Sequence, residues 1–506
     1  MMSVDPKTTF FRPFRGGVHP RSYKSLTARR SSQRSVLMPE KLYFSLQLPN
    51  GAMLKPLVAV GDVVTKGQKI AEGTSPMLAP LHSSANGQVV DITSHITAHP
   101  GKLKSPTIVV ATSNDLSWSR DYHSRSIASL TADEVINAIL EAGIVGLGGA
   151  GFPTGMKAKF ARQSQVETLV INGGECEPYL TCDDRLMQEQ SAQIIAGIRL
   201  LMIATGAKRA LVGIEDNKPL SLETMTNAAS EDPEIEVHSV PSLYPMGSER
   251  HLIKALTGEQ VPLGGLASDI GILVNNVATA HAIYQALRYG RPLVSRLITV
   301  SGKGISQPCN VEVPLGTRVR DVIAFCGGLT MDCERLIFGG PMMGQVVTDL
   351  DIPVGKTVGG ILALTSEEIG DCDSKECIRC GQCVRACPMG LMPFMIAANT
   401  RASEFEKAEE LGVKHCLSCG ACSYICPSHL PLVQYFQHAK GVLNQRSSAV
   451  QRAERAKQLA TAKTARLEEE ARAKQAAKEA KAKAKGKARG SRRSARKAET
   501  AKEGDV

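Results

Sequence analysis

The chain has 506 residues, of which 43% are hydrophobic, and it carries 60 Lys and Arg against 49 Asp and Glu. At about 150 residues per domain, this length predicts several domains with buried cores. Because no hydrophobic run approaches the roughly 20 residues of a membrane helix, the sequence excludes a membrane-spanning chain, and we expect no secretory signal. We therefore expect the 14 cysteines to be reduced rather than paired in disulfides.

The positive charge is concentrated at one end of the chain. Residues 451–506 hold 18 Lys and Arg against 8 Asp and Glu, whereas the first 450 residues hold 42 against 41. The net charge of +11 is thus a property of the tail. The globular part is not predicted to bind nucleic acid directly.

The N-terminal part begins with a basic, serine-rich segment over residues 1–40. In residues 41–112, glycines punctuate short β-prone runs, and we expect strands at 58–60, 63–64, 69–71 and 89–92. The stretch 60–68 resembles the turn of lipoyl and biotinyl carrier domains, so we predict a barrel-sandwich hybrid. The segment 83–87, where a carrier presents its modified lysine, contains none. We expect a structural module without a swinging arm.

An α/β domain is predicted over residues 125–292. Thr131, with Glu134 three residues later, predicts a capped helix over 131–142. Helices are also expected at 191–204 and 278–289, and buried strands at 168–171, 210–213 and 271–274. A glycine-rich loop, 143–155, contains the G-x-G-x-x-G pattern of Gly146, Gly148, Gly149 and Gly151. A helix rather than a strand precedes it, so a simple Rossmann dinucleotide site is rejected.

Two features of this domain point to a ligand. Glycines let backbone N–H groups approach a phosphate closely, and Lys157 adds a positive charge. Asn172, Glu175 and Glu177 follow the strand at 168–171, and open α/β sheets bind ligands at the carboxyl ends of their strands. We therefore predict a binding site formed by the glycine loop and these polar residues.

The remainder contains three further parts. Residues 295–365 are β-rich with one helix at 319–326, which indicates a small β-grasp module. Residues 366–442 hold the clustered cysteines, with helices between them. Residues 443–506 form an Ala- and Lys-rich tail that is predicted to be disordered or helical. The alternative to a solvated extension is attachment to anionic lipid, at about 1 kcal/mol per basic residue near the membrane surface.

Eight cysteines repeat one pattern twice, C-x-x-C-x-x-C-x-x-x-C-P. This is the run that holds two [4Fe–4S] clusters in bacterial ferredoxins, where the fourth cysteine of each run ligates the other cluster. The first cluster is therefore assigned to Cys377, Cys380, Cys383 and Cys426, and the second to Cys416, Cys419, Cys422 and Cys387. Structural zinc is disfavoured, because zinc ribbons use separate pairs of cysteines. Cysteines 176, 182, 309, 326, 333 and 372 are not expected to be ligands, and His251 and His281 are expected to be packing or surface residues.

Four motifs in order resemble the flavin- and NADH-binding subunit of respiratory complex I. They are Gly148–Lys157, Asn172–Pro178, Tyr244–Glu249 and Val274–Val277. With the paired cysteine runs, the carrier-like N-terminus and the tail, residues 15–440 resemble the C subunit of the Rnf electron-transport complex, also called Rsx. The resemblance implies a multidomain α/β and α+β chain with a Rossmann-like flavin/NADH domain, a soluble-ligand-binding β-grasp and a helical ferredoxin-like domain.

The resemblance also implies roles for individual positions. Glycines of the loop and Lys157 would hold the phosphate side of FMN. Phe152 and Phe160 would enclose the adenine of NADH, and Glu177 would contact the ribose beside the nicotinamide. The rest of the flavin pocket would be lined by Asn172, Glu175, Tyr244, Glu249, Asn275 and Asn276. Gly174, Ser248 and Ala278 stand where the complex I subunit has acidic residues.

The function implied is that of a peripheral electron-input subunit on the cytoplasmic face of the bacterial inner membrane. Electrons would pass between NADH, FMN and two [4Fe–4S] clusters, while other Rnf subunits translocate the ion, and no catalytic protein nucleophile or base is expected. Ferredoxin or a redox-sensing transcription factor would be an indirect partner. The alternative is a pure iron–sulfur adaptor with a vestigial flavin domain, and a third hypothesis is a scaffold whose modules serve contacts alone.

Overall fold

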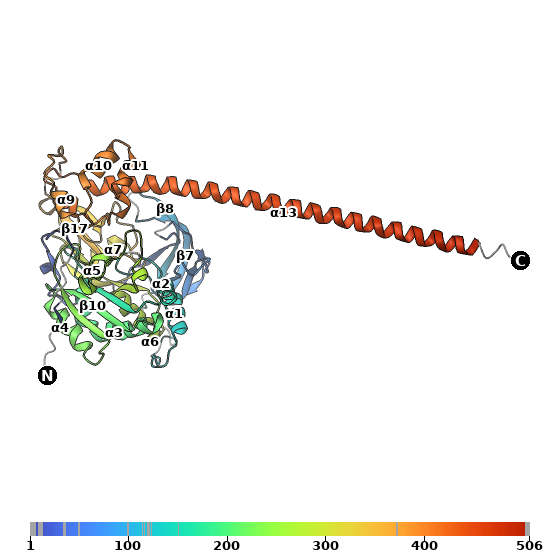
Figure 1. Ribbon diagram of the computed structural model, residues 1–506. Coiled ribbons are helices and arrows are strands. Elements are labelled where there is room, and N and C mark those ends of the chain that lie inside the picture. The colour runs from blue at the N-terminus through green and yellow to red at the C-terminus, as the bar shows by residue number, and fades with distance from the viewer. Residues whose placement is uncertain are drawn as a thin grey trace. The chain divides into compact units, whose positions relative to one another are not determined.

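The computed structural model describes residues 7–8, 14–33, 37–48, 51–98, 101–113, 115, 117–118, 122, 124–149, 151–370 and 373–500, with side chains described between residues 14 and 494 (Figure 1). Two compact units are present, Met1–Phe436 and Gln437–Val506. Cys372 and Ala150, as well as parts of the segment 1–40, lie outside the described residues.

The first module is a pair of small sheets around a core that includes Leu42, Val64, Ile70 and Ile108. The four-stranded sheet has the order β2-β8-β7-β4, and the three-stranded sheet has the order β3-β5-β6. Their strands are β2 (Lys41–Ser45), β3 (Lys55–Pro56), β4 (Val63–Val64), β5 (Lys69–Glu72), β6 (Leu81–His82), β7 (Gly87–Ile96) and β8 (Lys104–Thr112).

Three of the four strands expected here are confirmed, and the one at 58–60 is wrong. Val60 is 60% exposed and leads into a turn at Gly61, whose φ of 98° suits glycine. Ser83, Ser84 and Ala85 are buried, and the Asn86 side chain accepts a 2.8 Å bond from the backbone of Lys66. This segment packs into the module instead of projecting as a carrier tip.

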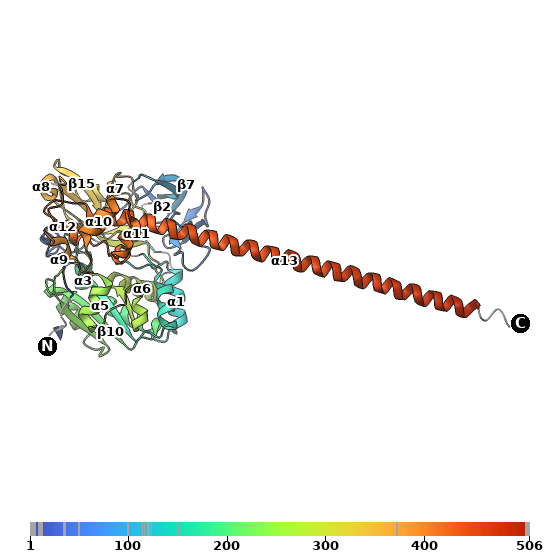
Figure 2. The same cartoon turned by 45° about the horizontal axis from the view of Figure 1, so that its top comes forward.

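The α/β domain is built on a five-stranded sheet in the order β1-β11-β10-β9-β12, and every pair in it is parallel. Its strands are β1 (Lys7–Thr8), β9 (Thr168–Gly173), β10 (Arg209–Glu215), β11 (Ile235–Val240) and β12 (Ile272–Asn276). Around the sheet lie α1 (Ala132–Glu141), α2 (Thr154–Gln163), α3 (Cys182–Thr205), α4 (Pro219–Ala228), α5 (Glu249–Thr257) and α6 (Val277–Tyr289) (Figure 1 and Figure 2).

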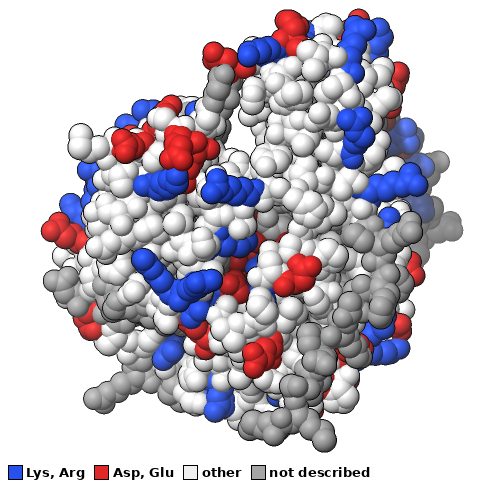
Figure 3. All heavy atoms as spheres, turned by 90° about the vertical axis from the view of Figure 1, so that its left-hand side faces the viewer, with Lys and Arg blue, Asp and Glu red and all other residues white. Residues whose placement is uncertain are grey.

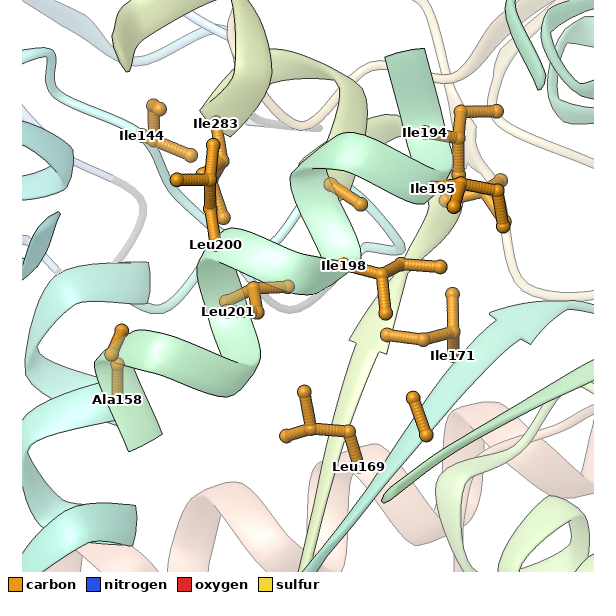
Figure 4. Packing of buried hydrophobic residues seen from close by; sticks show 14 of the residues in the cluster. Ile144, Ala158, Leu169, Ile171, Ile194, Ile195, Ile198, Leu200, Leu201 and Ile283 are labelled. Atoms are coloured by element: carbon orange, nitrogen blue, oxygen red, sulfur yellow. The ribbon is translucent and has the colours of Figure 1, made fainter. Parts of the chain in front are cut away.

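Apolar side chains cover both faces of this sheet. On one face, Ile198 and Leu201 of α3 pack toward Leu169 and Ile171 of β9 (Figure 4). On the other face, α5 contributes Leu252 and Ile253 to a second buried cluster. A parallel sheet covered on both sides is the arrangement that places polar side chains at its strand ends.

The expected helix over 131–142 is confirmed, including the reciprocal cap between Thr131 and Glu134. The helix expected at 191–204 begins earlier, at Cys182, with a non-helical residue at Gln190. Lys157, which follows the glycine loop, lies in the first turn of α2 rather than in the loop itself.

The next module is a mixed sheet in the order β14-β13-β17-β15-β16, packed with one helix. The elements are β13 (Ser295–Ser301), β14 (Cys309–Pro314), α7 (Val319–Phe325), β15 (Cys333–Phe338), β16 (Gln345–Val346) and β17 (Gly360–Thr365). Only β13 with β17 is a parallel pair, while the other neighbours are antiparallel.

The cysteine-bearing part is helical, with short helices around two loops. They are α8 (Ser366–Ile369), α9 (Gln382–Ala386), α10 (Pro393–Arg401), α11 (Phe405–Glu410) and α12 (Ala421–Tyr424). The last helix, α13 (Leu432–Thr500), includes the Ala- and Lys-rich tail, whose described side chains from residue 444 are exposed. Among the helices of the described residues, none is both long enough and apolar enough to cross a membrane.

Candidate functional site

The first cysteine hollow is lined by Cys377, Cys380, Cys383 and Cys426. Three of these cysteines come from one loop, and the fourth comes from the far end of the second run. Arg379 and Gly381 adopt φ values of 54° and 73°, which turn the loop tightly enough for its thiols to converge. Cys377 and Cys380 are exposed, so this hollow opens at the surface.

The second hollow is lined by Cys387, Cys416, Cys419 and Cys422. Ser418 and Gly420 have φ values of 56° and 82°, so the loop repeats the backbone geometry of the first. Cys419 and Cys422 are buried and the other two are half-buried. The structure thus brings together the two sets of four cysteines that the spacing predicts, each made of three cysteines from one run and the fourth cysteine of the other.

The chemistry of these thiols fits an iron–sulfur centre. Burial, reinforced by neighbouring thiols, raises the pKa of Cys383 and Cys387 and raises the pKa of Cys419 to about 11. A buried thiolate needs a nearby cation, and bound iron supplies one. Four converging sulfur atoms are the donor set of a [4Fe–4S] cluster.

The second hollow is packed against the α/β domain. Tyr244 Oη donates a 2.5 Å hydrogen bond to the carbonyl of Cys419. Val18, Tyr244, Ala386, Cys419 and Ala421 form one buried apolar cluster. The Cys416 set therefore lies beside one of the residues expected to line the flavin pocket.

Polar side chains meet at the carboxyl ends of β9 and β12, where Asn276 is in register with Asn172. Asn172 Nδ2 donates to the Gly247 carbonyl at 2.7 Å, and Asn276 Nδ2 donates to Asp183 Oδ2 at 2.7 Å. Asn275 is buried, and its Nδ2 has no hydrogen-bond partner among the described residues. These amides form one edge of the site.

The glycine loop lies beside this edge. Gly146 N donates to the Phe152 carbonyl at 2.8 Å, which closes the loop, and Leu147 N donates to Thr279 Oγ1 at 3.0 Å. Apart from its chain neighbours, no described residue has an atom within 4 Å of the position that a Gly149 side chain would take. Lys157 Nζ donates to the Val274 carbonyl at 2.5 Å and lies 3.5 Å from Glu249 Oε2. Lys157 and Glu249 are thus held at the end of β12.

The acidic loop, residues 174–180, makes more hydrogen bonds to the rest of the chain than the sequence suggests. Glu175 accepts hydrogen bonds from the backbone N–H groups of Asp183 and Asp184, at 2.8 and 3.2 Å, so it caps the first turn of α3. Burial raises the pKa of Glu175 to about 7. The expected lining residue therefore also starts a helix, which explains why α3 begins before residue 191.

Glu177 faces the mixed-sheet module. Its Oε2 accepts a 3.0 Å bond from Met342 N, and its Oε1 is buried without a hydrogen-bond partner among the described residues. Burial raises the pKa of Glu177 to about 7. A side chain at Gly174 would begin 3.0 Å from Asn172 Oδ1, so glycine permits this close approach.

Acidic and basic side chains gather near the middle of the face shown in Figure 3. Phe152 and Phe160, the residues expected at the adenine, are 37% and 44% exposed, so their rings are open to a ligand from solvent. Buried polar atoms of Asn275 and Thr154 have no hydrogen-bond partner among the described residues, so a bound ligand or water can take that place. The site residues fit a flavin nucleotide, whose ring and ribityl chain offer both donors and acceptors.

Sequence reasoning missed two cations. Lys24 Nζ donates to the carbonyls of Glu175, Glu177 and Leu180. Arg296, in β13, donates to the Leu147 carbonyl of the glycine loop. Each reaches the site from more than 140 residues away in the chain, so no local signal marks it. His251 and His281 are packing residues, with His251 against Phe14 and His281 bonded to Gln193.

Four known domain families match this chain in order. They are the RnfC barrel sandwich hybrid domain over 12–115, the Nuo51 FMN-binding domain over 139–285, the SLBB domain over 297–346 and the 4Fe-4S dicluster domain over 376–430. The C subunit of the ion-translocating oxidoreductase complex of Rhodobacter capsulatus is 44% identical over 454 residues, 88% of this chain and 87% of that protein. The chain belongs to the family of Rnf C subunits.

Other members of this family agree. The C subunit of the proton-translocating ferredoxin:NAD(+) oxidoreductase complex of Clostridium ljungdahlii is 41% identical, over 79% of this chain and 87% of that protein. The corresponding protein of Pectobacterium carotovorum is 39% identical, over 91% of this chain and 62% of that protein. Among solved structures, an NAD+-reducing [NiFe]-hydrogenase matches at 21% identity and a TM-score of 0.45, over 61% of this chain and 62% of that one. That likeness is too distant to bear on function.

Membership in the family of Rnf C subunits defines the coarse function. The chain is an electron-transfer subunit of an ion-translocating oxidoreductase complex, and its partners are other subunits of that complex. Its FMN-binding and dicluster domains assign it FMN and two [4Fe–4S] clusters. The expected multidomain architecture of barrel-sandwich, flavin-binding and dicluster domains is confirmed at this level.

Proposed function

We propose that this chain oxidises NADH at FMN and passes the electrons on through its two clusters, as the electron-input subunit on the cytoplasmic face of the bacterial inner membrane. The observation that carries the proposal is the contact between Tyr244 and Cys419, which joins the flavin-binding domain to one cysteine set. Such a contact holds one cysteine set close to the flavin-binding domain, which favours electron transfer between the two.

The cysteine ligands are proposed as the spacing assigns them. Cys377, Cys380, Cys383 and Cys426 would hold one cluster, and Cys416, Cys419, Cys422 and Cys387 the other, as supported by the two hollows that these residues line. The Cys416 set would be the inner centre, because it packs against the flavin-binding domain. The Cys377 set would be the outer centre, because Cys377 and Cys380 are exposed.

The flavin and NADH contacts are also proposed residue by residue. The glycine loop and Lys157 would hold the phosphate side of FMN. Phe152 and Phe160 would receive the adenine of NADH, which their exposure supports. The remaining lining is the set proposed from the sequence, namely Asn172, Glu175, Glu177, Tyr244, Glu249, Asn275 and Asn276.

Bound FMN supplies hydride acceptance and one-electron release, and the clusters supply one-electron transfer. The protein's own work is positioning and electrostatics. Lys157 offsets the negative charge of a phosphate, and Asn275 offers its free Nδ2 as a donor. With a pKa near 7, Glu177 can hold a proton at neutral pH, which limits repulsion of an anionic dinucleotide.

The finer domain assignments belong to the same proposal. We take 41–112 as a barrel-sandwich hybrid, 125–292 as a Rossmann-like flavin/NADH domain, 295–365 as a soluble-ligand-binding β-grasp and 366–442 as a helical ferredoxin-like domain. Residues 1–40 and 443–506 are the flanking segments. Ion translocation would belong to other subunits, with ferredoxin as an indirect partner. The names of the relatives give no support to a redox-sensing transcription factor as a partner.

NADH–ferricyanide reductase activity of the anaerobically purified chain tests the proposal against the adaptor alternative. An NADH-oxidising subunit reduces ferricyanide when NADH is added, and its activity disappears when FMN is stripped and returns when FMN is restored. A chain that holds both clusters but shows no NADH-dependent activity with FMN bound would be the pure electron-transfer adaptor.

A further inference from the structure

Residues 14–33 form a strap along the flavin-binding domain. At one end, Gly17 N donates to the Ala386 carbonyl at 3.0 Å, and Val18 pairs with Tyr244 through backbone bonds of 2.9 and 3.0 Å. At the other end, Gln33 N donates to the Asn310 carbonyl at 2.7 Å. The strap thus connects the cysteine-bearing part, the flavin-binding domain and the mixed-sheet module.

The middle of the strap lies on the acidic loop, residues 174–180. Tyr179 N donates to the Ser22 carbonyl at 2.8 Å, and the rings of Tyr23 and Tyr179 stack with centroids 4.6 Å apart. Next to them, Thr27 and Thr181 are bonded through their hydroxyls at 2.7 Å. These contacts fix the position of Lys24, which begins a short 3-10 helix, η1 (Lys24–Leu26).

Lys24 uses all three of its N–H donors on this loop. Its Nζ donates to the carbonyls of Glu175 at 2.8 Å, Glu177 at 3.0 Å and Leu180. An ammonium group has three donors and no acceptor, so these bonds satisfy it fully. A second cation, the buried Lys218, donates to the Gly174 carbonyl at 2.9 Å and to Glu215 Oε2 at 2.6 Å.

The loop needs such a constraint because its backbone is strained. Glu175 and Tyr179 have φ values of 35° and 69°, in the left-handed region that non-glycine residues rarely adopt. Conformations of this kind are unfavourable and persist only where surrounding contacts impose them. Three carbonyls turned toward one ammonium are a contact of that type.

We infer that Lys24 is a positioning residue of the flavin site, which holds the acidic loop so that Glu175 caps α3 and Glu177 faces Met342. The inference rests on the proposed function, because it takes this loop as part of the flavin and NADH pocket. Lys24 need not touch either ligand. Without its ammonium, the carbonyls of Glu175, Glu177 and Leu180 lose a shared donor, and the loop is free to leave the left-handed conformation.

The test uses the full chain with Lys24→Met, which keeps the length of the side chain and removes its charge. The control is Lys208→Met, because the Lys208 side chain is 75% exposed. FMN affinity is measured on flavin-stripped protein by quenching of flavin fluorescence, and KM and kcat for NADH are measured separately. Iron content and far-ultraviolet circular dichroism report whether the rest of the chain is intact.

We expect Lys24→Met to keep about eight iron atoms per chain and to weaken FMN binding by about tenfold, which corresponds to about 1.4 kcal/mol. We expect KM for NADH to rise more than kcat falls, and Lys208→Met to match wild type. Lys24→Arg, which restores a cation with several donors, should lie between Lys24→Met and wild type.

A folded Lys24→Met chain whose FMN affinity and NADH KM stay within about twofold of wild type would overturn the inference. Failure of both Lys24 variants to fold, with Lys208→Met folded, would also overturn it, since Lys24 would then serve general stability. A wild-type chain that binds no FMN would instead refute the proposed function, so the two failures are distinguishable.

Discussion

The two cysteine sets share one sequence pattern and one backbone geometry, yet their surroundings differ. In both loops a non-glycine residue and a glycine adopt positive φ at matching positions, Arg379 with Gly381 and Ser418 with Gly420. The Cys377 set opens at the surface through two exposed cysteines. The Cys416 set packs under Tyr244 of the flavin-binding domain.

This difference shows what a ligand pattern can and cannot specify. Spacing determines which sulfur atoms converge, because it depends on a loop of a few residues. The place of each centre along an electron path depends on which domain packs against its loop. That packing is a matter of tertiary structure, which the spacing does not determine. We therefore expect the Cys416 set to be an inner centre and the Cys377 set an outer one, and each experiment below depends on this difference.

The largest effect is expected from the fourth cysteine of each run. Cys426→Ala should remove the same centre as Cys377→Ala, and Cys387→Ala the same centre as Cys416→Ala, because each fourth cysteine lines the other hollow. Each variant should fall from about eight to about four iron atoms per chain. Iron analysis and electron paramagnetic resonance (EPR) spectra of the reduced proteins measure this.

Cys333→Ala is the matched control, because Cys333 is a half-buried cysteine outside both hollows. If Cys426→Ala removed the centre that Cys416→Ala removes, the cross-ligation would be wrong.

A smaller effect concerns the access of a chelator to the two iron–sulfur centres. The outer centre should lose iron to a chelator after mild oxidation about tenfold faster than the inner one, since two of its ligands are exposed. The EPR signals of the two centres, followed over time, report the two rates. Equal rates would remove the distinction between inner and outer sets.

The next effect concerns Glu177, which lies in the acidic loop and contacts the mixed-sheet module: the stability of the chain should depend on pH through this carboxyl group. Burial raises the pKa of Glu177 from its ordinary value of 4.5 to about 7. Its contribution to the free energy of unfolding is therefore fully present below pH 4.5 and is lost as the pH rises through about 7. Glu177→Gln should flatten this dependence, which has a slope of at most about 1.4 kcal/mol per pH unit.

Thermal unfolding between about pH 4.5 and pH 8, which spans the interval between the unfolded and folded pKa values of Glu177, measures the effect. Glu259→Gln, at an exposed carboxylate, is the control. An unchanged pH profile in Glu177→Gln would show that Glu177 does not titrate in this window.

The smallest effect is expected for Tyr244→Phe, which removes one hydrogen bond to the Cys419 carbonyl. The chain should lose about 1 kcal/mol of stability, and the midpoint potential should change at the inner centre only. Tyr424→Phe is the matched control, because Tyr424 is 50% exposed. A change of midpoint potential at the outer centre alone would contradict the assignment of the Cys416 set as the centre beside Tyr244.

The parts that the sequence could predict are those governed by local spacing. The two cysteine runs, the cap of Thr131 on Glu134 and the buried strands that carry Asn172 and Asn275 each depend on a few neighbouring residues, although both strands end two residues later than predicted. The family motifs supplied the remaining site residues through resemblance rather than geometry.

The parts that could not be predicted depend on distant contacts. Lys24 lies in a segment that reads as irregular, and its three acceptors are 151 to 156 residues away. The early start of α3 at Cys182 depends on the carboxylate of Glu175, which comes from the preceding loop. Val58–Val60 has a strand-like composition, but these residues lead directly into the turn at Gly61 and do not form a strand.

NADH reduction of the two single-centre variants shows whether electrons reach the inner centre first. Anaerobic Cys377→Ala should retain the inner centre, and Cys416→Ala the outer one. We expect NADH to reduce the centre of Cys377→Ala rapidly, whereas the centre of Cys416→Ala stays oxidised on the same timescale. Rapid reduction in Cys416→Ala alone, or zinc in place of iron in the wild-type chain, would contradict it.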